Sequence, residues 1–396
     1  MIAVGIDVSK SRSTAAVLKS DGTELLKPFV FKHNQNEMDP FIEYLKEQND
    51  KIVILMEPTG HYHYPVLKRF EEAGMPVCLI NPYLMKKVGE ANLRRVKTDK
   101  KDAIKLATYA LEKSYKLVPH SPMEEKYENL RLLSRQYRER MSSLTRNKVH
   151  LINLLDETMP GLGQVMSLKT RDPENSLALM FIRKYGSFDN IKKMGKKKFI
   201  DSYEKLVKKS NAKSPKEGLA LYELAISSIT THGDNEYAIM AQNQCLDLVI
   251  VSQKATDEII VKMEQIAQTI PEYKVLRGMH GVGERLGPLI LAEIGNVRRF
   301  HSAEALNAYA GNDPPPFESG NFESHNRHIS KCGNAALRKY CYEVMQALKL
   351  LRPQDDPVYL YLIKKEQEGK PFNVAKMAAV NKFLRIYYAK VKAMDK

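Results

Sequence analysis

The fold is decided by MIAVGIDVSK, residues 1–10, an apolar run that ends in the carboxylate Asp7. A second apolar run, IVILMEPTG at residues 52–60, ends in Glu57. The second run is short and continuous, which is typical of a buried central strand. We expect the two runs to form neighbouring strands at the centre of a sheet, with Asp7 and Glu57 converging where those strands end.

The residues around these two runs alternate between strand and helix patterns. Asp21 and Gly22 form a hairpin-turn signal between the second and third strand patterns. The order is three strands, a helix, a strand, a helix, a strand and a helix, which predicts a mixed sheet with covering helices. The expected strands are residues 2–7, 13–18, 24–31, 52–56 and 77–80, and the expected helices are residues 38–48, 64–73 and 99–111.

Asp99 and Asp102 stand three residues apart at the start of the last of these helices, so they share one helix face. Each acid by itself is most simply a surface residue, and Asp99 suits the region of a helix N-cap. Together with Asp7 and Glu57, however, they form a set of carboxylates that would repel one another unless cations neutralised them. Mg²⁺ or Mn²⁺ prefers such oxygen ligands, and two ions about 4 Å apart can clamp a phosphodiester. The set therefore predicts a metal site for phosphate chemistry.

A run of basic residues precedes and overlaps this acidic pair. Charge runs usually form a solvated face, but a run beside a phosphate-handling site is suited to binding the nucleic-acid backbone. We therefore include Lys97, Lys100 and Lys101 among the candidate DNA contacts.

The composition favours a nucleic-acid partner and a cytoplasmic location. The chain carries 62 Lys and Arg residues against 47 Asp and Glu residues, a net charge of +15. Such charge is typical of proteins that bind a polyanion, although a basic surface can also serve solubility alone. The four cysteines show no zinc-like spacing and are expected to be reduced thiols. We find no signal peptide and no apolar run of about 20 residues, so we expect no contact with a membrane.

Helical patterns dominate residues 120–270. Two long amphipathic segments, 123–155 and 242–270, predict either an antiparallel helical hairpin or a dimerising coiled coil, and a simple helical linker domain is the remaining alternative. The looser stretch between them is rich in lysine and contains Lys192, Lys193, Lys196, Lys197 and Lys198. These changes of pattern predict three domains, at residues 1–115, 120–270 and 271–396.

A glycine-rich segment of the last domain is a candidate DNA contact. Gly281, Val282 and Gly283 predict a turn between two helices, similar to that of a helix-hairpin-helix motif. Backbone N–H groups of such a turn, with the neighbouring Arg285, can contact a DNA phosphate. A plain helix–helix turn is the alternative.

A proline-rich loop later in this domain contains Ser319 directly before a glycine, so its hydroxyl can be exposed. Arg327 and Lys331 follow in the sequence and can hold a phosphate beside it. By residue type alone a Ser-Gly pair in a loop is a turn, because a serine needs activation before it acts as a nucleophile. Ser324 and Ser330 are rival hydroxyls, and Ser330 can instead cap the following helix.

Taken together, these motifs resemble those of the DEDD insertion-sequence transposases, relatives of the Piv-type DNA invertases. In the N-terminal part the similarity rests on GIDVSK, MEPTGHY and KTDKKDA. The C-terminal half agrees through GVG, AEIGN, AYAG, ESG and HISKCGNAALR, in the order of that family. The resemblance covers residues 1–155 and 240–390. It departs from the family at Asn312 and Asp313, because a Gly-Leu pair usually precedes the loop proline.

The resemblance implies an α/β domain of the RNase-H-like (RuvC-like) fold, in which Asp7, Glu57, Asp99 and Asp102 bind Mg²⁺. A helical coiled-coil middle and a mostly α-helical C-terminal transposase domain follow. It also implies that Ser319 attacks the DNA phosphate to form a covalent phosphoserine link, and that the acids of one subunit complete the serine site of another. A structured bridge RNA would pair with donor and target DNA.

We therefore expect a site-specific DNA recombinase of a mobile element, acting as a homodimer or homotetramer. The first alternative is a Holliday-junction nuclease that uses the acidic set to activate water. An actin-like ATPase or sugar kinase is a weaker alternative, because that class needs a second glycine-rich phosphate loop, which the sequence lacks at the required position. A nucleic-acid binder without enzymatic activity would not need the four acids.

Overall fold

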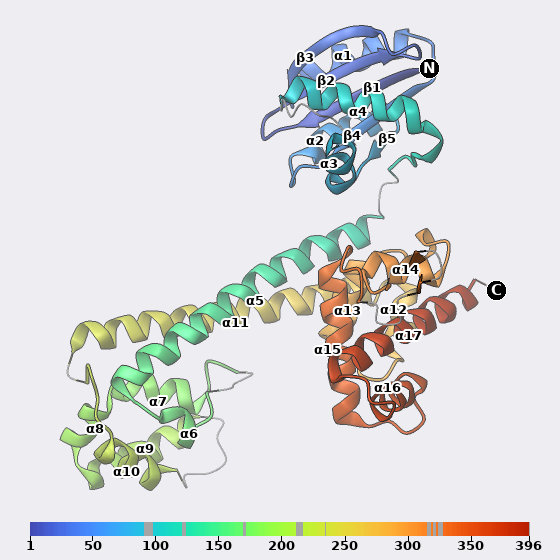
Figure 1. The fold of residues 1–396 in the computed structure, drawn as a ribbon. Coiled ribbons are helices and arrows are strands. Elements are labelled where there is room, and N and C mark those ends of the chain that lie inside the picture. The colour runs from blue at the N-terminus through green and yellow to red at the C-terminus, as the bar shows by residue number, and fades with distance from the viewer. Residues whose placement is uncertain are drawn as a thin grey trace. The chain divides into compact units, whose positions relative to one another are not determined.

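The computed structural model describes the chain in two compact units, residues 1–122 and 123–396, which are treated separately below (Figure 1). For residues 87–90, 318–319 and 322–323 it describes the backbone only. The described residues are 1–90, 98–120, 124–168, 172–210, 217–233, 235–314, 318–319, 322–323 and 328–395.

The first unit contains a five-stranded mixed sheet with the order β3-β2-β1-β4-β5. β1 pairs with β2, and β2 with β3, in antiparallel fashion, whereas β1 pairs with β4, and β4 with β5, in parallel. This order and these directions are those of the RNase-H-like fold, so the predicted fold class is confirmed. The strands are β1 (Ile2–Val8), β2 (Arg12–Lys19), β3 (Glu24–Lys32), β4 (Ile52–Glu57) and β5 (Val77–Leu79).

Helices cover both faces of this sheet. The even-numbered residues of β1 belong to a core that includes side chains of two helices, α1 (Gln35–Glu47) and α2 (His63–Glu72). Ala3 belongs instead to a core on the other face, together with side chains of α4 (Asp99–Lys113). Because successive strand residues point to opposite faces, Ala3, Gly5 and Asp7 all face α4. A further helix that the sequence did not predict, α3 (Pro82–Glu90), contributes Met85 to that second core.

Gly5 lets α4 lie directly on β1. A Cβ atom at Gly5 would stand 2.1 Å from the carbonyl oxygen of Ala103 and 2.3 Å from the backbone nitrogen of Ala107, so only glycine allows this approach of two backbones. Farther along, Ala3 shares its core with Leu106 and Ala110. The helix therefore runs opposite to β1, and its first turn lies toward the end of β1 where Asp7 stands.

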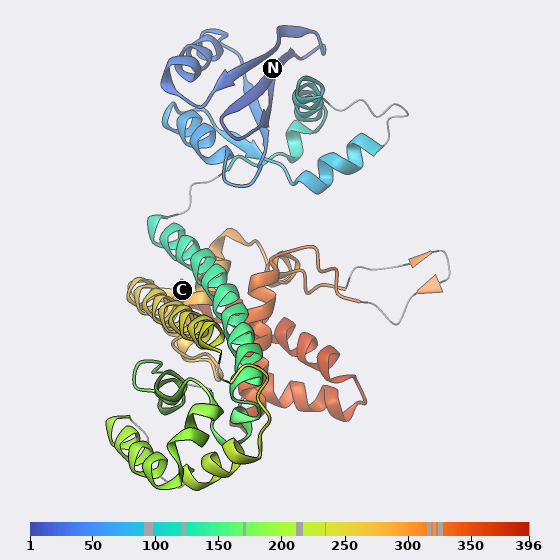
Figure 2. The ribbon, with the colours of Figure 1, turned by 90° about the vertical axis from the view of Figure 1, so that its left-hand side faces the viewer.

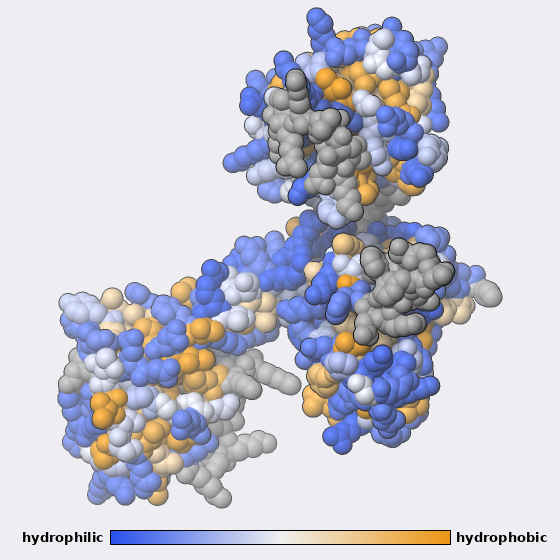
Figure 3. Space-filling view, viewed as in Figure 1, coloured by the Kyte–Doolittle hydropathy of each residue, from blue (hydrophilic) through white to orange (hydrophobic). Residues whose placement is uncertain are grey.

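Two long helices, α5 (Glu125–Thr158) and α11 (Glu236–Ala267), organise the second unit. They are antiparallel, because Asn147 contacts Ser252 while Thr158 at the end of α5 contacts Gln242 near the start of α11. Of the predicted alternatives, the antiparallel hairpin is the one observed within the chain. Its surface is mixed: hydrophilic residues dominate the middle of the pair in Figure 3, and large apolar side chains such as Leu132, Leu248 and Val251 are exposed as well.

The sequence between α5 and α11 forms short helices, which pack around a separate hydrophobic core. The lysine-rich stretch expected to be loose is instead helical, because apolar residues at helical spacing bury one face of it. The helices are α6 (Leu162–Val165), α7 (Leu177–Tyr185), α8 (Phe188–Met194), α9 (Lys196–Lys209) and α10 (Gly218–Ser227).

The remaining helices of this unit pack around a second core, to which α5 and α11 also contribute. They are α12 (Pro271–Arg277), α13 (Leu286–Ile294), α14 (Ala303–Ala310), α15 (Ala335–Leu351), α16 (Pro357–Gln367) and α17 (Phe372–Ala393).

The four cysteines are free, as predicted. Within the described residues, every helix is too short or too polar to cross a bilayer. The division into three domains stays a prediction.

We predict that Gly5→Ala destabilises the first unit by about 1–3 kcal/mol, because the added methyl group forces α4 away from β1. Chemical unfolding followed by circular dichroism measures the change. Gly163→Ala in α6 is the matched control, because a Cβ there has no atom within 4 Å. Equal stability of the two variants would contradict the packing described above.

Candidate functional site

Asp7 and Glu57 are direct neighbours at the ends of the two central strands. They are paired residues in the parallel register of β1 and β4, and paired residues of adjacent strands point to the same face, about 4.8 Å apart in the sheet. Pro58 follows Glu57 and lacks the N–H that would continue the ladder. Both carboxylates are half-buried on the face that α4 covers. The predicted convergence of these two residues is observed.

Asp99 and Asp102 lie in the first turn of α4. Thr98 caps the helix, with its side-chain oxygen accepting from the Lys101 N–H at 3.3 Å. Acidic residues there stabilise the positive end of the helix dipole. Asp99 is exposed, whereas Asp102 is half-buried and accepts a hydrogen bond from Lys105 Nζ at 2.8 Å. Because α4 runs opposite to β1, this turn lies toward the end of the sheet that carries Asp7.

The chemistry of this set suits a hard divalent cation, since all four candidate ligands are carboxylates. In the described residues, however, no three His, Cys, Asp or Glu side chains gather closely enough to hold an ion. The Lys105 ammonium at Asp102 supplies part of the positive charge such a set requires. The fold thus brings the acids to one end of the sheet, while their closure around an ion stays a prediction.

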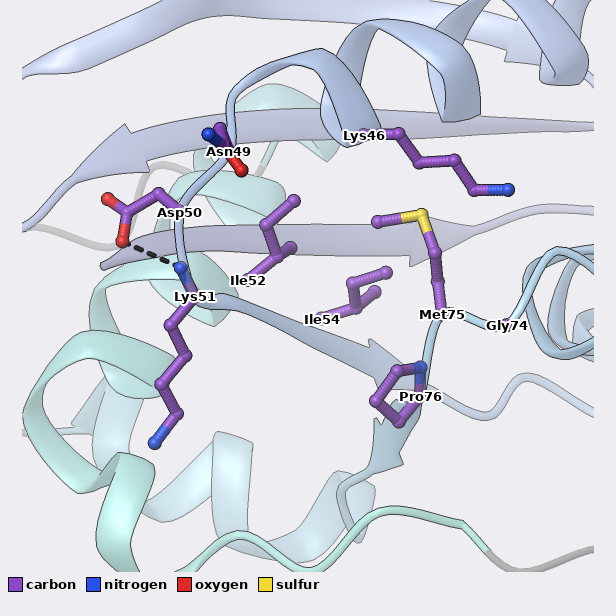
Figure 4. A pocket seen from close by; sticks show the side chains of 9 residues that line it. All are labelled: Lys46, Asn49, Asp50, Lys51, Ile52, Ile54, Gly74, Met75 and Pro76. Carbon is purple, nitrogen blue, oxygen red and sulfur yellow. Dashed lines mark hydrogen bonds between the residues drawn. The ribbon is translucent and has the colours of Figure 1, made fainter.

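A hollow of the first unit lies elsewhere. Its volume is about 490 Å³, and it is lined by Ile52, at the start of β4, and by Met75 and Pro76, before β5 (Figure 4). This is the end of β4 opposite to Glu57. The hollow therefore has no part in the acidic site.

Two of the basic residues proposed to contact DNA, Lys100 and Lys101, are exposed in the first turn of α4. The third, Lys97, lies outside the described residues. Their role in binding the nucleic-acid backbone stays a prediction.

In the second unit, the predicted glycine turn joins α12 to α13. Gly281 has φ +80°, and a Cβ there would stand 3.0 Å from the Val344 carbonyl oxygen on α15. Gly283 is exposed and has no atom within 4 Å of its Cβ position, so a ligand can approach its backbone. Arg285 is engaged within the protein, where its guanidinium donates to Glu343 at 2.7 Å and to the Tyr137 hydroxyl at 3.2 Å. A phosphate at Arg285 would have to share it with Glu343.

Ser319 is described by its backbone alone. It lies in β6 (Glu318–Ser319), which pairs with β7 (Phe322–Glu323), and Ser319 is the register partner of Phe322 (Figure 2). The serine is therefore the last residue of β6 and lies opposite the first residue of β7. Arg327 lies outside the described residues, whereas Lys331 is exposed with φ +53°.

A backbone ladder closes the base of this loop. We call it the neck, residues 309–313 and 330–334. Its hydrogen bonds run from the Asn334 N–H to the Tyr309 oxygen (2.7 Å), from the Lys331 N–H to the Gly311 oxygen (3.1 Å) and from the Ser330 N–H to the Asp313 oxygen (2.9 Å). A Cβ at Gly333 would stand 2.5 Å from both Gly311 N and Tyr309 O. The two legs of the neck are therefore in direct backbone contact, which requires glycine.

A buried carboxylate holds one leg of the neck. Glu293 on α13 is almost fully buried, and it accepts from the Asn334 side-chain amide and from the Ser134 hydroxyl, both at 2.7 Å. Asn334 is also the N-cap of α15, accepting from the Leu337 N–H at 3.0 Å. The Tyr309 hydroxyl donates to the Glu293 carbonyl oxygen. Sequence reasoning missed this network, although an Asn before the run Ala-Ala-Leu is a helix-start signal.

The other leg is held by the residue at which the sequence departs from the DEDD pattern. Asn312 is buried, and its amide donates to the Met377 carbonyl oxygen of α17 at 3.1 Å. The hydroxyl of Ser330 donates to Asp313 at 2.8 Å. The alternative in which Ser330 caps the following helix is therefore wrong, because Asn334 takes that position.

The comparisons with known proteins agree with these motifs. A family model for the DEDD transposases of the IS110 group matches residues 4–160, and the transposase model of the IS116/IS110/IS902 family matches residues 273–359. An uncharacterised 43.6 kDa protein of insertion element IS110 from Streptomyces coelicolor is 22% identical, covering 85% of this chain and 81% of that protein. The transposase for insertion sequence element IS1533 from Leptospira borgpetersenii is 36% identical, over 26% of this chain and 29% of its own length.

Among solved structures, the RuvC protein of T. thermophilus in complex with a Holliday junction substrate is 19% identical to this chain. It matches over 30% of this chain and 99% of its own, with a TM-score of 0.24. The two family models match the segments that contain the acidic set and the glycine turn with the serine loop. The chain therefore belongs to the DEDD transposases of the IS110 group of insertion sequences.

Proposed function

We propose that this transposase is a site-specific DNA recombinase that cleaves and rejoins DNA by transesterification, with Ser319 as the nucleophile and the four acids as ligands of Mg²⁺ or Mn²⁺. The observation that carries the proposal is the pairing of Asp7 with Glu57 beneath the helix that begins with Asp99. In an RNase-H-like domain of a transposase, carboxylates at this end of the sheet are suited to phosphodiester chemistry. Divalent ions there would stabilise negative charge on the reacting phosphate oxygens.

In the proposed step, the Ser319 oxygen bonds to phosphorus and the bond from phosphorus to the departing strand breaks. The hydroxyl proton leaves the serine, and the departing oxygen takes up a proton. The phosphoserine link keeps the free energy of the broken bond, so rejoining needs no nucleotide cofactor. The neck contributes by holding the base of the loop, since its legs are fixed to α13 and α17.

The proposal extends to a guide RNA as well as donor and target DNA, in an assembly of two or four subunits. The net charge of +15 supports a polyanionic partner. The acids and Ser319 belong to different compact units. Holliday-junction hydrolysis by the same acids is the alternative, and it differs in leaving no protein–DNA adduct.

The serine role predicts that Ser319→Ala abolishes both recombination and a covalent adduct with DNA. The assay incubates the protein with guide RNA and paired DNA sites, then measures joined products and denaturant-resistant adduct. Ser324→Ala is the matched control, because it removes a rival hydroxyl of the same loop. If only Ser324→Ala loses the adduct, Ser324 and not Ser319 is the nucleophile. If the unaltered protein leaves hydrolysed DNA ends and no adduct, the Holliday-junction nuclease is favoured instead.

The metal role predicts that Asp7→Asn weakens Mn²⁺ binding by at least about tenfold, because one carboxylate ligand becomes neutral. Titration calorimetry on the full chain measures the affinity. Asp21→Asn is the control, since Asp21 accepts hydrogen bonds from Thr23 in the β2–β3 turn. An unchanged Mn²⁺ affinity in Asp7→Asn would remove Asp7 from the ligand set.

The neck predicts that Gly333→Ala slows recombination with little change in DNA affinity, because the methyl group separates the two legs. Hydrogen exchange should become faster at the amides of Ser330, Lys331 and Asn334. Gly163→Ala again serves as control. Undiminished protection of these amides, together with an unchanged rate, would show that the neck does not position the loop.

A further inference from the structure

The segment from α7 to α9 is the most basic part of the second unit with no assigned role. Residues 177–210 contain ten Lys and Arg residues against three acids. The segment lies outside both matched family regions, 4–160 and 273–359. Its charge is therefore a feature of a helical part of the chain that contains neither the acidic set nor the serine loop.

An aromatic cluster fixes how α9 sits in this segment. Phe199 and Tyr203 of α9 are fully buried, and their rings contact Phe181 of α7. Tyr185 of α7 packs on Phe199 as well, with 5.2 Å between ring centroids. With this face buried, the lysines of α9 are held on the solvent side.

Four of these lysines form one continuous group, which we call the lysine ladder. Lys198, Lys205 and Lys209 follow one another at helical spacing, and the first and last are about 16 Å apart along the helix. Lys184 joins them from α7, because its Nζ donates to the carbonyl oxygen of Ser202, which lies between Lys198 and Lys205.

The ladder carries more positive than negative charge, and its neighbouring acid is Asp201, three residues after Lys198 and four before Lys205. Partial burial, and then the nearby charges of Lys209 and Lys205, lower the pKa of the Lys184 ammonium. Within the part of the chain that the structure describes, no acidic group forms an ion pair with a ladder lysine. The same chain neutralises lysines elsewhere, as in the pair Lys365–Glu368. Asp201 is exposed and offsets part of this charge, so the four lysines leave a net positive group on a rigid support.

We propose that the lysine ladder binds the sugar-phosphate backbone of a nucleic-acid duplex. Lysine is a compact point charge that suits phosphate and reads no base sequence by itself. The inference rests on the proposed function, because it assigns to this enzyme a second, accessory contact with its nucleic acid. The duplex can be a helical stem of RNA or DNA, and the experiment distinguishes the two.

The test compares the full-length protein with a variant carrying Lys198→Ala, Lys205→Ala and Lys209→Ala. The probes are a short RNA duplex and a DNA duplex of the same sequence, and the dissociation constant is measured over a range of salt concentrations. For the duplex that binds the ladder, we expect a loss of affinity of about tenfold or more, and a slope of log affinity against log salt that is shallower by about three. If affinity falls for only one of the two probes, that probe shows whether the ladder binds RNA or DNA.

The matched control carries Lys364→Ala, Lys370→Ala and Lys390→Ala, which remove the same charge from exposed positions on α16, in the turn between α16 and α17, and on α17. A second variant replaces Lys198, Lys205 and Lys209 by arginine and should retain binding. Equal losses in the ladder and control variants, or no loss in either, would overturn the proposal. The adduct assay with Ser319→Ala tests the serine chemistry, whereas the duplex titrations test the ladder, so failure of the two proposals is separately visible.

Discussion

The contact between the backbone of α4 and Gly5 is the constraint on which the acidic site depends. A side chain at Gly5 would overlap Ala103 and Ala107, so the helix can lie this close to β1 only where the strand has no Cβ. Because helix and strand run in opposite directions, the same contact directs the first turn of α4 toward the end of the sheet with Asp7. The position of Asp99 and Asp102 along the sheet therefore depends on the absence of a side chain at Gly5.

Repulsion between the carboxylates opposes the close arrangement that this packing produces. Asp7 and Glu57 are register partners on adjacent strands, and like charges at that separation destabilise each other in a half-buried setting. Lys105 offsets some of this charge through Asp102, and the N-terminus of α4 offsets more. A fold that holds carboxylates together at its sheet end gains stability whenever a cation binds there, which is the physical reason to connect this geometry with a divalent ion.

The sequence was informative wherever local pattern and strand adjacency decide the structure. Apolar runs ending in Asp7 and Glu57 predicted two central strands and the meeting of the two acids, because parallel neighbours end at the same edge. The helical form of the lysine-rich stretch was missed, since its lysines obscured the apolar face of Phe199 and Tyr203. The neck could not be predicted, because it consists of hydrogen bonds between backbone groups about 20 residues apart, which leave no periodic signal.

Both proposed centres of chemistry depend on the same device, a glycine that permits contact between two backbones. At the acidic site Gly5 allows α4 to lie on β1, and at the serine loop Gly333 allows the two legs of the neck to come into backbone contact. Such contacts fix positions more firmly than side-chain packing, because a backbone cannot change rotamer. Buried polar groups then secure the neck: Glu293 holds Asn334, and Asn312 holds α17. Since each of these groups would lose its hydrogen-bond partner if the neck opened, the base of the loop is expected to stay closed.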